Sequence, residues 1–113
     1  MTRPRNKLVK HSLLADIPAE LPEELVEILA TVDHGRVERI VSRGHASPPD
    51  FWYDQDRHEF VLLVQGSAGL AVDGMDQEIV LFPGDYLDIP AHVKHRVNWT
   101  ERGTDTVWLA VFH

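Results

Sequence analysis

The sequence predicts an all-β domain, a sandwich or barrel of antiparallel strands, with one short helix ahead of it. From Gly35 onward, short apolar runs alternate with turn residues at a spacing typical of small sandwiches and barrels. Residues 1–20 show no clean period, and at about residues 22–33 apolar residues recur at helical spacing instead. The 113 residues have room for one such domain with one hydrophobic core.

The expected helix spans about residues 22–33, PEELVEILATVD. Leu25, Ile28, Leu29 and Val32 recur at helical spacing, and a proline followed by two glutamates suits the first turn of a helix. We therefore expect residues 1–34 to form an N-terminal segment whose short helix packs on a barrel built by residues 35–113.

Eight apolar stretches follow, and each is an expected strand. They read RVERIVS, FWYDQ, EFVLLVQ, AGLAV, QEIVLF, DYLDI, HRVNW and DTVWLAVF. Asp73 and Gly74 suit the centre of a two-residue hairpin turn, and residues 82–85 form a second turn. The runs FVLLV and VWLAVF lack alternation, so we expect both of their faces to be covered, one by the barrel interior and the other by the helix or a second subunit. This pattern favours a homodimer formed by sheet-to-sheet packing.

The composition excludes several classes of function. There is no cysteine, which removes disulfides, thiolate metal sites and cysteine nucleophiles, and leaves imidazole, carboxylate, amide and hydroxyl groups for chemistry. The formal net charge of −7 disfavours a nucleic-acid partner. No stretch is long and apolar enough for a membrane span, and the first residues lack the features of a secretory signal. We therefore expect a cytoplasmic protein with no membrane partner.

The stretch DFWYDQDRHEF, residues 50–60, crowds polar and aromatic side chains directly before an apolar run. If Glu59 faces inward and the chain before it is extended, Gln55 and Tyr53 also face inward, whereas Asp54 and His58 face outward. A bulge between residues 55 and 59 would reverse this order and bring Asp54 inward. This stretch is either the rim of a site or part of the site itself.

Two segments carry a resemblance to a known family. Glu59 is followed by six residues and Gly66, and further on Gly84, Pro90 and His95 stand in the segment GDYLDIPAHVKH. These spacings resemble the end of the first motif and most of the second motif of the cupin superfamily, and the chain is similar to small single-domain cupins of the conserved-barrel, cupin 2 type. His92 stands where the second motif usually has Gly. The first motif is degenerate, because its two histidines would lie at 52 and 54 or at 53 and 55, and these positions hold Trp52 and Asp54 or Tyr53 and Gln55.

The resemblance implies an antiparallel β-barrel of the jelly-roll type that holds one divalent metal ion inside. It assigns Glu59 and His95 as metal ligands, and inward-facing Gln55 would stand in for a missing histidine, with Asp54 as the alternative. Oxygen-rich ligands suit Mn²⁺, Fe²⁺ or Zn²⁺. Trp52, Tyr53, Asp54 and His92 are the expected pocket residues, and the His92 side chain can turn either inward or outward.

Two classes of function follow from these residues. In the first, the metal acts on or helps to bind a small oxygenated or carboxylate-bearing molecule. In the second, a metal-free and non-catalytic barrel binds a small ligand as a sensor or carrier, and Glu59 and His95 supply hydrogen bonds. The sequence does not specify a reaction or catalytic residues, because one fold hosts many chemistries.

Overall fold

The computed structural model describes residues 8–113, and its regular elements in that range are eight β-strands. Their bounds are β1 (Leu25–Val32), β2 (Gly35–Ser42), β3 (Glu59–Gln65), β4 (Ala68–Val72), β5 (Ile79–Leu81), β6 (Tyr86–Ile89), β7 (His95–Thr100) and β8 (Thr106–Phe112). The expected all-β fold is confirmed. No helix long and apolar enough to cross a membrane occurs among these residues.

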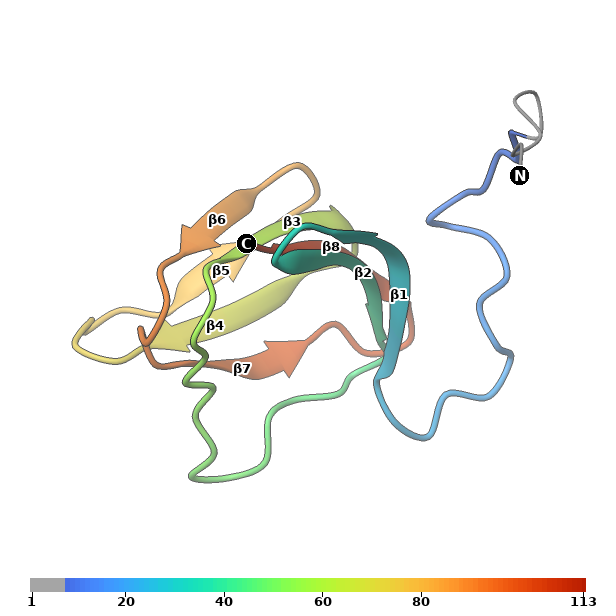
Figure 1. The fold of residues 1–113 in the computed structure, drawn as a ribbon. Coiled ribbons are helices and arrows are strands. Elements are labelled where there is room, and N and C mark those ends of the chain that lie inside the picture. The colour runs from blue at the N-terminus through green and yellow to red at the C-terminus, as the bar shows by residue number, and fades with distance from the viewer. Residues whose placement is uncertain (1–7) are drawn as a thin grey trace.

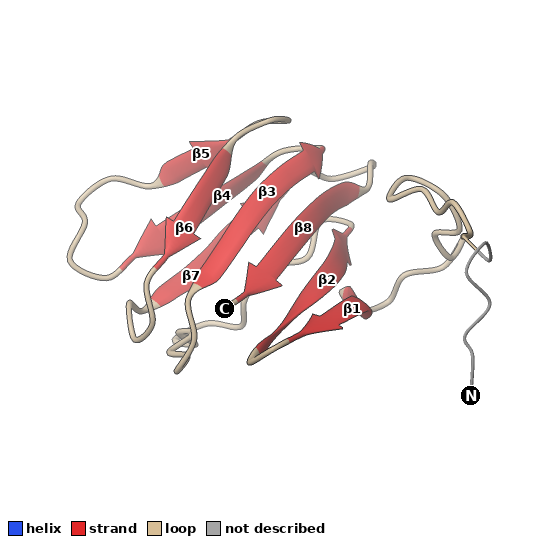
Figure 2. Ribbon diagram, turned by 45° about the horizontal axis from the view of Figure 1, so that its top comes forward, coloured by secondary structure: helices blue, strands red, loops and turns tan. Residues whose placement is uncertain are grey.

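The strands form two antiparallel sheets that enclose the core. The larger sheet has the order β1-β2-β8-β3-β6, and the smaller has the order β5-β4-β7 (Figures 1 and 2). Side chains alternate between the two faces of each strand, so Val61, Leu63, Leu70 and Trp108 meet in the core between the sheets. The larger and the smaller sheet thus form the walls of a jelly-roll barrel.

The expected helix at residues 22–33 is wrong, because Leu25–Val32 form strand β1 of the larger sheet. This strand pairs antiparallel with β2 from Leu25 opposite Val41 to Val32 opposite Gly35, with a bulge between Ile28 and Ala30. Pairing with β2 is a contact with a distant segment of the chain, and such contacts override a local helical spacing of apolar residues.

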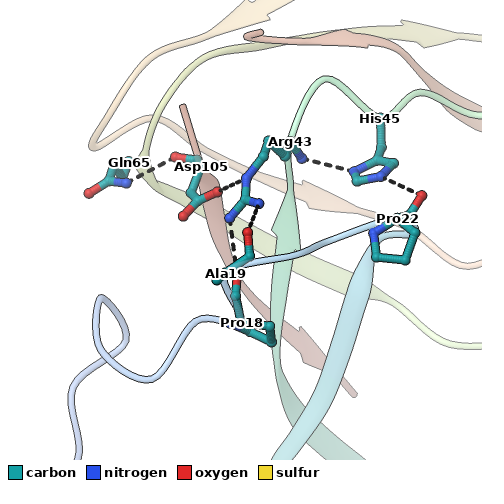
Figure 3. A network of polar contacts seen from close by, with 7 residues as sticks. All are labelled: Pro18, Ala19, Pro22, Arg43, His45, Gln65 and Asp105. Atoms are coloured by element: carbon teal, nitrogen blue, oxygen red, sulfur yellow. Dashed lines mark hydrogen bonds and ion pairs between the residues drawn. The ribbon is translucent and has the colours of Figure 1, made fainter. Parts of the chain in front are cut away.

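The segment ahead of β1 is tied to the outer face of the larger sheet by two arginines of the β2 region. Arg39 is 5% exposed, pairs with Glu27, and donates hydrogen bonds to the carbonyl oxygens of residues 13, 15 and 16. Arg43 pairs with Asp105 and donates to the carbonyls of Pro18 and Ala19 (Figure 3). Backbone oxygens are therefore what hold this segment in place.

Most of the other expected strands form close to their expected bounds, with two differences. FWYDQ contributes only an isolated bridge between Tyr53 and His95, so it is an irregular extended segment. The turn at Asp73 and Gly74 is present, with φ of 87° at Gly74, but the connection runs on to Glu78 before β5 begins. It is therefore longer than a two-residue hairpin loop.

The two apolar runs are covered unequally on their two faces. In β3, Glu59, Val61 and Leu63 are buried, whereas the residues between them are half-buried. In β8, the outward Val107 is fully buried, while Leu109 and Val111 remain half-buried. The interior face is thus fully covered, and the outer face only in part.

The motif glycine Gly66 directly follows β3, and its surroundings show why this position lacks a side chain. Its φ is 89°, and a Cβ atom built there would lie 2.8 Å from the Cα of Thr106. Only glycine combines this backbone conformation with so close an approach to β8.

Candidate functional site

The core opens at one end into a cavity of about 230 Å³ between the two sheets. The expected metal ligands Gln55, Glu59 and His95 all line it, and so does Tyr53. Apolar walls come from both sheets, with Val61 and Trp108 on the larger and Leu70 on the smaller. The cavity therefore combines a few polar groups with an apolar lining, as small-molecule sites usually do.

Glu59 and His95 meet in the cavity because each begins a strand of a different sheet. Glu59 starts β3 and is paired with Ile89 and Phe112 on its two sides, while His95 starts β7 opposite Val72. Glu59 is 9% exposed and His95 is 5% exposed. The His95 Nε2 atom lies 3.3 Å from Glu59 Oε1. A buried carboxylate and imidazole are thus held against each other.

The hydrogen bonds of His95 define the role of each ring nitrogen. Nδ1 lies 3.0 Å from the carbonyl oxygen of Val93, which can only accept, so Nδ1 carries a proton. Burial by itself lowers the pKa of His95, but the hydrogen bonds to Glu59 and Val93 and the charge of Glu59 outweigh it, so the pKa lies above 6.5. Without a metal, the Glu59 carboxylate therefore stabilises the charged form of the imidazole more than water does. Deprotonation would free Nε2 as a ligand.

Gln55 lines the cavity, and its Oε1 atom is buried without a hydrogen-bond partner among the described residues. The backbone around it is fixed, because the Gln55 carbonyl accepts a 2.7 Å hydrogen bond from the His92 amide. The neighbouring Tyr53 also lines the cavity, with its ring stacked on the His95 ring at 5.5 Å. Burial, helped by the charges of Glu24 and Glu59, raises the pKa of Tyr53, which keeps its hydroxyl a donor at neutral pH.

The remaining expected pocket residues lie at the rim or outside. Asp54 points away from the cavity and its Oδ1 lies 3.0 Å from His92 Nδ1, so the His92 side chain turns outward. Trp52 is 38% exposed and does not line the cavity. His92 has a φ of 65°, the left-handed conformation that explains why glycine is usual at this position.

Several cavity residues were not predicted from the sequence. Glu24, Arg36, Glu38 and Trp108 also line the cavity. Arg36 Nε donates to Glu38 Oε2 at 2.6 Å, and its guanidinium lies 4.1 Å from the centre of the Phe112 ring. The alternation of Arg36, Glu38 and Ile40 in RVERIVS is a signal that these residues share one face, but sequence alone does not show that the face is interior.

The donor set of the cavity suits a hard or borderline cation, but it is small. Among residues 8–113, no three His, Asp or Glu side chains come close enough together to form a metal site by themselves. The orphaned amide oxygen of Gln55 is a third possible donor beside the Glu59 and His95 pair. Metal binding by these three residues stays a prediction.

Comparison with known proteins identifies a matching family and similar structures. Residues 37–112 match the family described as Cupin domain. A candidate mannose-6-phosphate isomerase from Ralstonia eutropha JMP134 is 46% identical, with a TM-score of 0.89, over 93% of this chain and 97% of its own. A cupin superfamily protein from Desulfitobacterium hafniense DCB-2 is 26% identical, with a TM-score of 0.68, over 85% of this chain and 82% of its own.

A more distant structure shows the fold alone. It is a cupin family protein with a double-stranded β-helix fold from Methanocaldococcus jannaschii, 16% identical, with a TM-score of 0.65, over 86% of this chain and 85% of its own. No curated protein matches the chain.

Proposed function

This chain is a member of the cupin family, and from that membership we propose that its cavity binds one divalent metal ion on Gln55, Glu59 and His95. The ion is Mn²⁺, Fe²⁺ or Zn²⁺, and a small oxygenated or carboxylate-bearing molecule binds or reacts beside it. The observation that carries the proposal is the buried, unpartnered Oε1 of Gln55 in the same cavity as the Glu59 and His95 pair. A buried acceptor without a partner is costly, and a cation or a ligand proton would satisfy it.

The surroundings of His95 also support a ligand role. A metal-bound histidine usually holds its second ring nitrogen with a hydrogen bond to a carbonyl or carboxylate, which fixes the orientation of the ring. His95 makes such a bond through Nδ1 to Val93, which leaves Nε2 on the side of Glu59. When bound, the metal would polarise an oxygen of the small molecule as a Lewis acid.

The rest of the cavity would bind and orient that molecule. Trp108 and Val61 supply apolar wall, and Trp108 Nε1 is a buried donor without a partner among the described residues. The Tyr53 hydroxyl, kept protonated by its raised pKa, can donate a hydrogen bond or a proton. Arg36 lines the same cavity with a side chain that is 39% exposed, so it can meet an anionic group at the mouth.

Metal content tests the proposal most directly. We expect untagged protein purified without chelators to carry about one divalent metal per chain, measured by elemental analysis. His95→Ala should lose it while keeping the far-ultraviolet circular dichroism of the folded barrel. The matched control His113→Ala changes an exposed histidine that does not line the cavity, and its metal content should be unchanged. Unchanged metal content in His95→Ala would place the site elsewhere.

A metal-free binding barrel is the second candidate, and one observation favours it. Glu59 and His95 lie within reach of each other, so the pair is satisfied without a cation. In this case the two residues bind a small ligand by hydrogen bonds. Ligand binding that persists in the presence of a chelator, with no metal in the purified protein, would support this candidate over the first.

The similarity to the Ralstonia protein suggests the first compound to test. Mannose 6-phosphate carries both hydroxyl groups and an anionic group, so it falls within the proposed class of ligands. Calorimetric titration into the metal-loaded chain, with mannose as the uncharged control, would show whether a phosphorylated sugar binds here.

A further inference from the structure

Glu24 is the one glutamate of the cavity that has no ion pair within residues 8–113. Three glutamates line the cavity, together with one arginine and one histidine. Glu38 is paired with Arg36, and Glu59 lies against His95. The other ion pairs of the described residues lie outside the cavity and do not involve Glu24. Its carboxylate therefore remains available to a bound molecule.

The carboxylate of Glu24 is held at the cavity by a neighbouring strand. Glu24 directly precedes β1 and lines the cavity on the same side as Val26. The hydroxyl group of Ser42, the last residue of β2, donates a 2.9 Å hydrogen bond to Glu24 Oε2. The residue is otherwise exposed, so a molecule that enters the cavity can reach its carboxylate.

The backbone ahead of Glu24 is fixed by His45. The ring nitrogen Nδ1 of His45 accepts a hydrogen bond from the Arg43 amide, and Nε2 lies 3.1 Å from the carbonyl oxygen of Pro22 (Figure 3). A carbonyl oxygen can only accept, so a neutral His45 with its proton on Nε2 satisfies both contacts. Pro22 is two residues ahead of Glu24, and the direction of the Glu24 side chain is therefore set from both its backbone and its carboxylate.

The surroundings of Glu24 disfavour a further negative charge. Burial raises the pKa of Glu24 and outweighs the hydrogen bond from Ser42 and the charge of His45, while the charge of Glu59 adds to the rise. A carboxylate or phosphate of a bound molecule would meet the same loss of water and the same repulsion.

The formal charges of the cavity lead to the same conclusion with or without metal. With a divalent metal beside Glu59 and neutral His95, the two metal charges balance Glu24 and Glu59, and Arg36 balances Glu38. Without metal, and with His95 charged, the negative charge of Glu24 is in excess. An anionic group would make the cavity negative in the first case and more negative in the second, whereas an uncharged group would not.

A carboxylate can only accept hydrogen bonds, so its complement is a donor. An ammonium group would be repelled by the metal and by Arg36 in the same cavity, which leaves a hydroxyl group as the better fit. Arg36 lines both the cavity and a second pocket outside it, and its side chain is 39% exposed. Negative charge is therefore favoured at the mouth and disfavoured beside Glu24.

We propose that Glu24 selects which end of a ligand enters the cavity: it accepts a hydrogen bond from a hydroxyl group of a polyhydroxylated molecule and excludes a carboxylate or phosphate group. Any anionic group of the same molecule stays with Arg36 at the mouth. The inference rests on the proposed function in one respect, that the cavity binds a small oxygenated molecule, and it does not depend on the metal.

Two small probes test this selection. Erythritol and tartrate share a four-carbon chain with two inner hydroxyl groups, but tartrate carries a carboxylate at each end and cannot present an uncharged end. We expect erythritol to shift the indole N–H signal of Trp108, a cavity residue, in nuclear magnetic resonance titrations of the nitrogen-15-labelled protein. Tartrate should bind about tenfold more weakly. The exposed Trp52 lies outside the cavity and is the internal control.

The titrations are made with Zn²⁺-loaded and with chelator-treated protein, because tartrate itself binds metal ions. Metal content is checked after each titration. The same order of affinities is expected in both forms, since the excess of negative charge that tartrate would bring does not require the metal.

A charge-neutralising variant assigns the effect to Glu24. Glu24→Gln should weaken erythritol binding about fivefold and strengthen tartrate binding about tenfold, because a charged acceptor is lost and the repulsion with it. The glutamine amide oxygen can still accept from Ser42, and circular dichroism should show an unchanged fold. Glu23→Gln is the matched control, since this neighbouring glutamate is exposed and does not line the cavity, and both affinities should stay unchanged.

Three results would each overturn the proposal: no shift of the Trp108 signal with erythritol, equal affinity of the wild type for the two probes, or equal effects of Glu24→Gln and Glu23→Gln. The first two use the wild type alone, so they do not depend on how the variants fold. A chain that carries metal but does not distinguish the probes keeps the proposed metal site and loses the role of Glu24. A chain without metal that prefers erythritol through Glu24 keeps this role and loses the metal site.

Discussion

His92 adopts a backbone conformation that a residue with a side chain normally avoids. Its φ of 65° is left-handed, and its ring is exposed and paired only with Asp54 at the surface. The backbone amide of His92 is nevertheless needed where it is, since it donates to the Gln55 carbonyl. The conformation is therefore imposed by the loop that holds Gln55, and the side chain contributes little to it.

Replacing this histidine by glycine should stabilise the protein. A left-handed backbone conformation destabilises a residue with a Cβ by about 1–2 kcal/mol. The exposed pair with Asp54 stabilises the folded state by only about 0–1 kcal/mol. We expect His92→Gly to raise the free energy of unfolding by up to about 1 kcal/mol in urea titrations. His92→Val should lower it, because a β-branched residue fits this conformation worst. A loss of stability in His92→Gly would show that the surface pair matters more than the strain.

Gln55 and Asp54 offer a second comparison at the scale of single residues. Gln55 lines the cavity and Asp54 lies outside it, so only Gln55→Ala should weaken metal binding. An amide oxygen is a weaker ligand than an imidazole, and we expect a loss of about tenfold in affinity, close to 1.4 kcal/mol. Isothermal titration with Mn²⁺ and Zn²⁺ on the two variants measures it. A loss confined to Asp54→Ala would mean that the carboxylate turns inward when metal binds.

The sequence predicts the candidate ligands of the cavity, but it does not predict the other residues that line the cavity around them. Glu59 and His95 follow from motif spacing, and the inward direction of Gln55 follows from the alternation of an extended chain. Glu24 and Glu38 reach the cavity through the pairing of β1 with β2. That pairing depends on contacts between segments that local spacing does not encode.

At the scale of elements, β1 shows that a strand can carry apolar residues at helical spacing. Leu25 and Ile28 lie on opposite faces of β1, because their partners on β2 are Val41 and Glu38, and Leu29 lies in the bulge. A strand with apolar residues on both faces can therefore carry them at spacings of three and four. The other strands have regular alternation or turn residues at their ends, which is why most of them were predicted near their observed bounds.

Arg39 is the side chain on which the placement of the N-terminal segment depends most. It is nearly buried and bonds to Glu27 and to three carbonyl oxygens. Arg39→Ala leaves these acceptors without donors, and we expect a loss of about 3 kcal/mol in the free energy of unfolding. Urea titration measures this loss, and limited proteolysis should show earlier cleavage within residues 8–22.

Two further variants sharpen the Arg39 comparison. Arg39→Lys keeps the charge but not the planar set of donors, so it should fall between wild type and Arg39→Ala. Lys94→Ala removes an exposed cation of the loop before β7 and should change stability by less than about 0.5 kcal/mol. Equal stability of Arg39→Ala and Lys94→Ala would mean that the segment ahead of β1 adds nothing to the fold.

At the scale of the whole molecule, the Glu59 and His95 pair links stability to pH. The folded-state pKa of His95 is raised above 6.5, so its contribution is fully present below about pH 6.5 and is lost as the pH rises through the raised value. Metal-free wild type should therefore lose stability relative to His95→Gln as the pH rises from about 6.5 through the raised pKa of His95. Urea titrations across this range, in the presence of chelator, measure the difference. Parallel curves for the two proteins would show that the pair is not charged in the folded state.

Metal binding should have the opposite pH dependence. A cation on Nε2 competes with the proton that the Glu59 carboxylate favours, so metal affinity should rise over the same range in which the metal-free protein weakens. If metal binds as proposed, one cation, the proton, is exchanged for another at the same place in the core.

The way in which Arg39 and Arg43 hold the segment ahead of β1 has a consequence for how this chain can vary. Apart from Glu27 and Asp105, their acceptors are main-chain oxygens, which every amino acid possesses, proline included. Pro18 can serve as an acceptor for that reason, although it has no amide hydrogen to give. These hydrogen bonds to the backbone therefore do not depend on which side chains the held residues carry. Apart from Asp16, whose left-handed φ of 56° restricts the residue type, the outward side chains of residues 13–19 are free to be exchanged for others, by evolution or by design, while the path of the chain stays the same.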